Sequence, residues 1–157
     1  MPVPASPLTP VRGTFHALTA TVVPDAAGLD ERGWERLDAI VGEALATRPP
    51  SLVRQLRLFV RVVDLLPLLR HGRTFRGLSP ARRLALLERL ERSRLRAVRR
   101  GVWGVRTLAF MGYYGQDDVR RRIGYRAHPD GWDAASGGPV SAAPGAADEG
   151  AASAEEP

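Results

Sequence analysis

The sequence predicts an all-α protein of five to six helices in a compact bundle, followed by a disordered acidic C-terminal tail. Three observations lead to this fold class. Apolar residues recur at helical spacings of three and four between residues 14 and 123. The alternation of apolar and polar residues that is typical of strands does not occur over any length. After about residue 127 the chain is rich in Ala, Gly, Pro and Ser and has almost none of the large apolar residues that a packed core needs.

The composition divides the chain into three parts. Residues 1–13 are expected to form a Pro-rich N-terminal arm, residues 14–126 the helical domain, and residues 127–157 the disordered tail. Residues 1–126 hold all 23 Arg against 11 acidic residues, which leaves +12, whereas residues 127–157 hold six acidic residues and no Arg, which gives −6. Because the chain has no Lys at all, this Arg content is more typical of a GC-rich coding sequence than of a polyanion-binding protein.

Two helices are predicted before the proline pair at positions 49 and 50. The first covers residues 14–23 and ends at Pro24, with three apolar residues on one face: Phe15, Leu18 and Val22. The second covers residues 29–47, with Asp30 or a neighbour as its N-cap. Its apolar residues recur at the same spacing: Trp34, Leu37, Val41 and Leu45.

A third helix, residues 51–70, carries two apolar stripes. The first stripe is Leu52, Leu56, Phe59, Val63 and Leu66, and the second is Leu58, Val62, Leu65 and Leu69. Because the polar strip between them is narrow, this helix is expected to be mostly buried. Pro67 is expected to kink the helix or end it early. In the loop that follows, Phe75 is expected to pack back on the domain.

The fourth helix begins at Ser79-Pro80, a pair typical of the N-cap and the first helical position, and three of its residues should face the core: Leu84, Leu87 and Leu90. The fifth helix, residues 95–114, is predicted to be the spine of the domain. One apolar stripe on it is Leu95, Val98, Val102, Val105, Ala109 and Gly112, and the other is Trp103, Thr107, Phe110 and Tyr114. Its glycines each cost helix stability, which close approach of a neighbouring backbone would offset. A last short helix over residues 117–123 is expected, with Asp117 as its cap.

No pattern of a catalytic, cofactor or metal site occurs in the sequence. The absence of Cys excludes disulfides and thiolate metal sites. The three histidines, His16, His71 and His128, lack metal-ligand spacing and are expected to be exposed or locally hydrogen-bonded. No Gly-rich phosphate loop is present, and helix capping explains the pair Asp117-Asp118. No segment spans a bilayer and the N-terminus lacks a secretory signal, so a cytoplasmic location is expected.

Function is therefore expected to lie in binding another protein. An Arg cluster at positions 94, 96, 99 and 100 forms a solvated face, or pairs with Glu88 and Glu91, or forms the rim of an interface. Tyr and Trp near the end of the domain are typical interface anchors. The candidate interface residues are Arg96, Arg99, Arg100, Trp103, Phe110, Tyr113, Tyr114, Tyr125 and Trp132, with core packing as the alternative for Phe110 and Tyr114. These aromatic residues lie on apolar helix faces rather than on an open stacking platform, which disfavours nucleic acid.

Short motifs follow one another in a distinctive order along residues 14–126. They are Phe15, Leu18 and Val22-Val23-Pro24; Phe75-x-x-Leu78-Ser79-Pro80; Arg94; Arg106-Thr107-Leu108; Gly112-Tyr113-Tyr114; and Ile123-Gly124-Tyr125. Their order and spacing resemble the small third subunit of gluconate 2-dehydrogenase-type membrane dehydrogenases.

The resemblance implies a non-catalytic helical subunit that binds a large flavoprotein of the glucose–methanol–choline oxidoreductase type, which it stabilises or helps to mature. FAD and the substrate site would belong to that partner, so no cofactor and no small-molecule substrate are expected in this chain. The small subunit of that family often carries a twin-arginine signal, whereas here Arg12 stands alone without an apolar stretch. The expected role is therefore assembly or stabilisation, in the cytoplasm or in a complex exported on the partner's signal. The alternative is a stand-alone Arg-rich helical binding module that contacts nucleic acid.

Overall fold

Helix α6 (Arg96–Tyr114) is the central element, and α1, α2, α3, α5 and α7 all pack against it. This computed structural model describes residues 6–124 of the chain. The other α-helices are α1 (Arg12–Val22), α2 (Glu31–Ala46), α3 (Pro50–Leu65), α4 (Leu68–His71), α5 (Pro80–Glu91) and α7 (Asp117–Arg122). Three 3-10 helices also occur: η1 (Thr9–Val11) precedes α1, η2 (Pro24–Gly28) joins α1 to α2, and η3 (Phe75–Gly77) joins α4 to α5. No strand occurs in this part of the chain, so the all-α prediction is confirmed.

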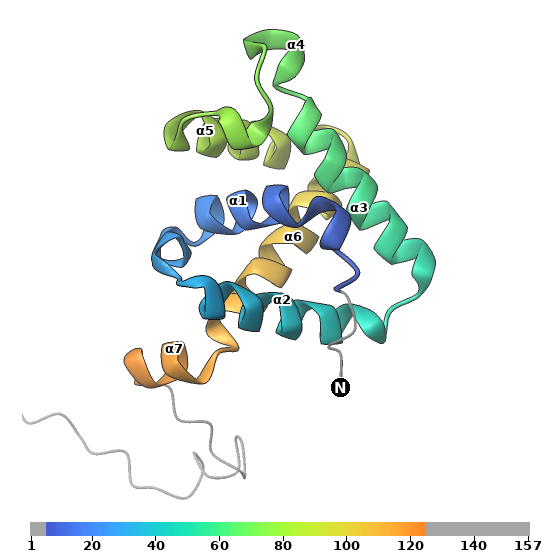
Figure 1. Cartoon of the computed structure of the whole chain (residues 1–157). Coiled ribbons are helices and arrows are strands. Elements are labelled where there is room, and N and C mark those ends of the chain that lie inside the picture. Colours follow the sequence, from blue (N-terminus) through green and yellow to red (C-terminus); the bar gives the residue numbers. More distant parts are fainter. Residues whose placement is uncertain (1–5, 125–157) are drawn as a thin grey trace, which may run out of the picture. The chain divides into compact units, whose positions relative to one another are not determined.

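The remaining helices surround α6 on several sides. In Figure 1, α1 crosses in front of α6, with α2 below α1 and α5 above α1. Helix α3 descends along the right of the view. The prediction that α6 is the spine of the domain is therefore confirmed. The expected disordered tail lies outside the described residues.

The helical domain begins earlier in the sequence than residue 14. Leu8 and Val11 are buried in the core, and α1 starts at Arg12. The Arg57 guanidinium on α3 donates a hydrogen bond to the carbonyl of Pro7, which ties the start of the described chain to that helix. Residues 6–13, expected to belong to a separate arm, are thus part of the packed unit.

Helix α2 agrees closely with its sequence pattern. Asp30 caps it, because its side chain accepts a hydrogen bond from the Gly33 backbone N–H at 2.7 Å. Its inward stripe, Leu37, Val41 and Leu45, is buried as predicted.

At α7 the expected cap is wrong, because Gln116 occupies the N-cap position and Asp117 lies in the first turn.

Helix α3 ends at Leu65, as expected from Pro67, whose missing N–H stops the hydrogen-bond ladder. The prediction that α3 is mostly buried is wrong. Its buried residues form a single stripe: Val53, Leu56, Val60 and Val63. Only Leu56 and Val63 come from the first predicted stripe, whose Leu52 and Leu66 are exposed. The second predicted stripe is exposed throughout: Leu58, Val62, Leu65 and Leu69. The helix has core neighbours on one side only, so a single stripe of roughly 100° can be covered.

The loop before α5 is held by aromatic packing and an Arg side chain. Phe75 is fully buried, as expected, and the Arg83 Nε donates to its carbonyl oxygen at 3.2 Å. Pro80 opens α5, although Ser79 makes no capping hydrogen bond through its side chain. Of the leucines expected to face the core, Leu87 is buried, Leu90 is half-buried and Leu84 is exposed.

Two glycines of α6 admit side chains of neighbouring helices. A Cβ atom on Gly112 would lie 2.8 Å from Leu37 Cγ and 2.9 Å from Val41 Cγ2, both on α2. A Cβ on Gly101 would lie 2.5 Å from the Phe59 ring of α3. Side chains rather than a neighbouring backbone therefore occupy the space. Gly104 has no such neighbour within 4 Å among the described residues.

None of the helices between residues 6 and 124 has the length and hydropathy of a bilayer span.

Candidate partner-binding face on helix α6

The outward side of α6 carries eight exposed residues in one continuous strip. At about 100° per residue, positions seven and eleven apart return to nearly the same side of a helix. The strip, called here the outer face of α6, consists of Arg96, Arg99, Arg100, Trp103, Arg106, Thr107, Phe110 and Tyr114. The opposite side of the helix is buried through Val102, Val105, Ala109 and Gly112. The outer face therefore lies on the helix against which α1, α2, α3, α5 and α7 pack.

The C-terminal half of the outer face is aromatic. Trp103 is 71% exposed, and Phe110 and Tyr114 are 38% and 39% exposed. The rings of Phe110 and Tyr114 are stacked, with their centroids 6.1 Å apart. An exposed apolar residue standing alone is ordinary, but aromatic residues that follow one another along one helix form a patch.

Arg106 fixes part of this patch in place. Its guanidinium forms an ion pair with Glu91 and lies 5.9 Å from the centroid of the Phe110 ring. An open hollow of about 420 Å³ lies beside these groups, lined by Glu91, Arg99, Val102, Trp103, Arg106, Thr107 and Phe110. Because the ion pair and the ring contact already order Arg106 and Phe110, a partner loses less side-chain entropy on binding here.

The N-terminal half of the outer face is strongly basic. The expected pairing of the Arg cluster with Glu88 and Glu91 is wrong, because Glu88 lies 3.8 Å from Arg92 and Glu91 pairs with Arg106. Within residues 6–124, none of the four arginines at positions 94, 96, 99 and 100 forms an ion pair. The first turn of α6 has no acidic residue, and no side chain caps it. The positive end of the helix dipole therefore adds to the Arg charges, an arrangement that favours an acidic partner surface.

Tyr113 does not belong to the outer face, although the sequence placed it among the interface residues. Its side chain is only 3% exposed and packs in the hydrophobic core. Burial raises the pKa of the Tyr113 hydroxyl, and the negative charge of Asp25 raises it further. The other predicted residues between 96 and 114 are all exposed, whereas Tyr125 and Trp132 lie outside the described residues.

Sequence reasoning missed a polar clamp between α1 and α2. The Nε2 atom of His16 lies 2.9 Å from Asp38 Oδ1, and Arg12 donates to the other oxygen of the same carboxylate. The His16 ring also stacks on Trp34, with centroids 4.2 Å apart. This agrees with the expectation of a locally hydrogen-bonded His16, but no sequence signal links residues 22 positions apart. With both carboxylate oxygens and one ring face engaged, the cluster is suited to holding two helices together.

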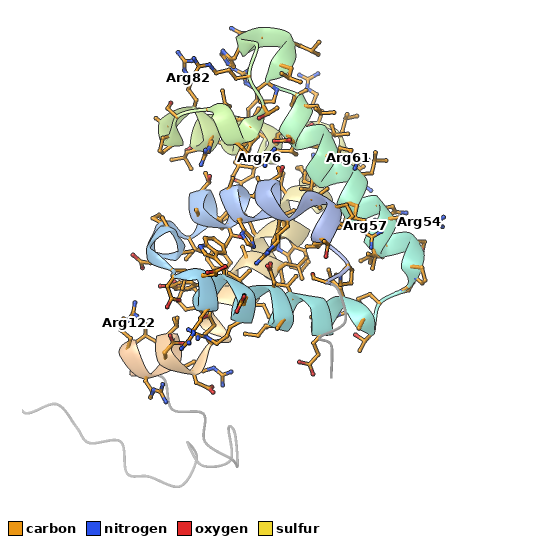
Figure 2. All side chains as sticks on the ribbon, in the orientation of Figure 1. Arg54, Arg57, Arg61, Arg76, Arg82 and Arg122 are labelled. Atoms are coloured by element: carbon orange, nitrogen blue, oxygen red, sulfur yellow. The ribbon has the colours of Figure 1, made fainter. Side chains whose placement is uncertain are left out.

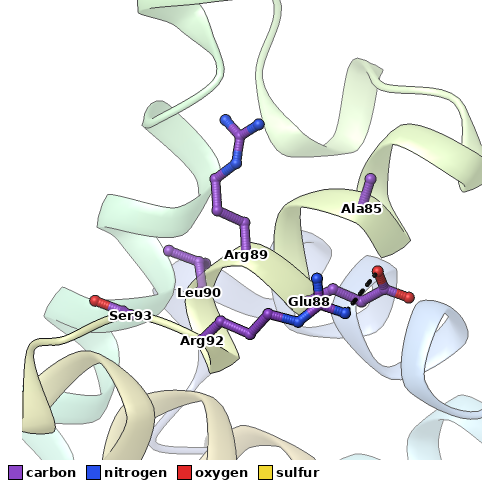
Figure 3. A pocket seen from close by; sticks show the side chains of 6 residues that line it. All are labelled: Ala85, Glu88, Arg89, Leu90, Arg92 and Ser93. Atoms are coloured by element: carbon purple, nitrogen blue, oxygen red, sulfur yellow. Dashed lines mark ion pairs between the residues drawn. The ribbon is translucent and has the colours of Figure 1, made fainter.

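A further hollow, at the end of α5, offers little to a ligand. Figure 3 shows this hollow, where Glu88 and Arg92 reach toward each other and Arg89 points the other way. The ion pair there joins residues four apart on an exposed helix, which contributes little to stability or recognition. Among residues 6–124, no three His, Cys, Asp or Glu side chains come close enough to hold a metal ion.

No protein-family model, no curated protein and no solved structure matches this chain. The resemblance to the small third subunit of gluconate 2-dehydrogenase-type enzymes therefore stays a prediction. The surface chemistry of α6 and the motifs in the sequence are what bear on the function.

Proposed function

We propose that this chain is a non-catalytic subunit that binds a larger oxidoreductase through the outer face of α6. The observation that carries the proposal is the exposed aromatic patch on the central helix, with Trp103 at 71% exposure. Trp, Tyr and Arg are the residue types that dominate binding energy in protein interfaces. All three residue types occur side by side on this face, and the opposite side of the same helix is packed in the core.

The charge distribution of the face favours a particular partner surface. Its basic half, at Arg96, Arg99 and Arg100, suits an acidic rim, and its aromatic half suits an apolar recess. Burial of Trp103 against such a recess is expected to supply a large share of the affinity, since truncation of a central Trp typically costs at least about 2 kcal/mol.

The motifs in the sequence support one class of partner for this proposal. The resemblance makes it a flavoprotein of the glucose–methanol–choline type that oxidises a sugar or an alcohol. FAD and the substrate would bind to that partner, and this chain would stabilise it or help it to mature. The complex would reside in the cytoplasm, or would be exported on a signal carried by the partner.

Co-purification tests the proposal directly. The tagged native chain, expressed in its source cells, is expected to recover a flavoprotein that carries bound FAD, identified by mass spectrometry and by its flavin absorbance. Trp103→Ala is expected to weaken this association by about 30-fold, the equivalent of roughly 2 kcal/mol. Leu84→Ala on α5 is the matched control, because Leu84 is exposed and apolar but lies on another helix. Recovery of no oxidoreductase, or equal recovery with Trp103→Ala, would contradict the proposal.

The Arg cluster, which forms no ion pair within residues 6–124, supports a second candidate, a stand-alone module that contacts nucleic acid. Such a module would bind duplex or single-stranded nucleic acid with an affinity that falls steeply as salt increases. A titration at physiological salt separates the candidates, because only the nucleic-acid module is expected to retain measurable binding there.

A further inference from the structure

A second apolar surface lies on α3 and α4. It consists of Leu58, Val62, Leu65, Leu66, Leu68 and Leu69, and is called here the α3–α4 strip. Leu69 is 92% exposed and Leu58 is 63% exposed. On α3, Leu58, Val62 and Leu65 follow at spacings of four and three, on the side opposite to buried Val53 and Val60. None of these residues belongs to the outer face of α6.

The chain around this strip is almost purely basic. Residues 48–87 hold nine Arg and a single acidic residue, Asp64. Figure 2 shows Arg54, Arg57 and Arg61 along α3 and, near α5, Arg76 and Arg82. Apart from the guanidinium groups of Arg57 and Arg83, which donate to backbone carbonyls, the Arg side chains of this segment have no hydrogen bond or ion pair to a residue in the described range. Exposed leucines thus stand among guanidinium groups that have no counter-charge.

The combination of exposed leucines and basic charge argues against two molecules that could cover the α3–α4 strip. A second copy packed on the same strip would bring Arg side chains of equal charge together, which opposes association. The chain's own acidic segment, residues 127–157, has the opposite charge, but its only large apolar residues are Trp132 and Val140. Neither occupant matches the charge and the apolar area together.

We propose that the α3–α4 strip docks on the surface of an anionic lipid bilayer. Leucine side chains on one side of a helix enter the boundary between headgroups and acyl chains, while Arg side chains remain at the level of the phosphates. Arg54 and Arg61 flank the leucines of α3, so both interactions form together. Stable attachment to a membrane generally needs two such signals, an apolar one and a basic one.

The break at Pro67 places the most exposed leucine where it can reach the bilayer first. After Pro67 the chain forms the single turn of α4, which ends at Gly72 in a left-handed conformation with φ of 61°. Leu68 and Leu69 stand on this turn, beyond the end of α3. The turn extends the strip rather than closing it, and leaves Leu69 nearly free of contact with the domain.

Vesicle sedimentation with the full chain tests the docking. Binding is expected to vesicles of phosphatidylcholine with about one third phosphatidylglycerol, and to fall as salt increases, whereas vesicles of phosphatidylcholine alone should bind weakly. Leu65→Ser with Leu69→Ser is expected to lower the partition coefficient by about tenfold or more. Each of Arg54→Gln and Arg61→Gln is expected to lower it about fivefold. Ile123→Ser is the control, since Ile123 is exposed but lies beyond α7.

A labelled variant reports which residues meet the lipid. The chain has no Cys, so a dye that senses polarity can be attached uniquely after Leu69→Cys or, as the control, after Ile123→Cys. A blue shift with anionic vesicles is expected for the dye at position 69 and not for the dye at 123. All variants should first show the helical circular dichroism spectrum of the unaltered chain.

Three results would overturn the proposal. The first is no binding to anionic vesicles at low salt. The second is binding that Leu69→Ser leaves unchanged or that Ile123→Ser lowers equally. The third is a dimer, or a complex with an acidic protein, that depends on Leu69 while vesicle binding is absent. The oxidoreductase proposal is judged separately, because its test depends on Trp103.

Discussion

The two apolar stripes of α6 have the same spacing and opposite environments. Val105 and Ala109 on the inner stripe are buried against surrounding helices, whereas Trp103 on the outer stripe is 71% exposed. Hydrophobicity therefore does not decide which stripe is covered. What decides it is whether the rest of the chain has a helix to place there, and for the outer stripe the described residues supply none. This difference in burial is the reason for proposing the outer stripe as the side that binds a partner.

The glycines of the helix follow the same division. Gly112 lies where side chains of α2 fill the space that a Cβ would need, and Gly104 lies where nothing is within 4 Å. The same residue type is thus required by packing at one position and free of packing constraints at the other. Four experiments test the contrast between the buried and the exposed side of α6.

The largest effect is expected from a core residue that packs against the inner stripe. Leu37→Ala removes buried atoms of α2 and leaves a cavity, so the free energy of unfolding is expected to fall by about 3 kcal/mol. Trp103→Ala should change it by less than about 0.5 kcal/mol in the isolated chain. Urea denaturation of the two variants measures both values. An equal loss from Trp103→Ala would show that the outer stripe is already packed, and the comparison would fail.

Alanine substitution of the two glycines should change stability in opposite directions. Gly112→Ala forces Leu37 and Val41 to move and is expected to cost about 1–3 kcal/mol. Gly104→Ala meets no atom and raises helix propensity, so a gain of up to about 1 kcal/mol is expected. Thermal unfolding of both variants distinguishes the two signs. Destabilisation by Gly104→Ala would indicate a close neighbour at that position.

Charge reversal at the start of α6 is expected to raise the free energy of unfolding and to weaken partner binding. Arg96→Glu places a negative charge at the positive end of the helix and should add about 0.3–1 kcal/mol of stability. It should also weaken the association with an acidic partner surface. Arg96→Gln, which removes the charge without reversing it, is expected to give a smaller change in both measurements. A loss of stability in Arg96→Glu would mean that Arg96 has a contact which favours its charge.

The smallest effect concerns Tyr113 and appears only at high pH. Burial raises the pKa of its hydroxyl above the ordinary value of 10.0, so the folded state favours the neutral form. The unfolded chain releases this proton first as pH rises, and the stability that Tyr113 contributes is lost between the unfolded pKa and the higher folded pKa. Denaturation between about pH 8 and pH 11 should show this decline, and Tyr113→Phe should reduce it. An unchanged decline in Tyr113→Phe would assign it to another group.

Much of the fold follows from local signals in the sequence. Asp30 caps α2, Pro67 ends α3 and Pro80 opens α5 because each acts on backbone groups within a few positions of itself. The exposed strip of the candidate site was also visible as the second stripe on α6. Tyr113 was misplaced because it lies at the edge of that strip, where a small rotation decides between core and surface.

The sequence by itself determined the helices, their approximate ends and the apolar stripe of α2, since these depend on neighbours three or four positions apart. Only the tertiary structure decided which side of α3 and of α6 is buried, because one core can cover one side of each helix. It also decided the clamp of His16 on Asp38 and the pairing of Glu91 with Arg106, which join residues far apart in the chain. Long-range contacts of this kind arise from packing geometry, and no local pattern encodes them.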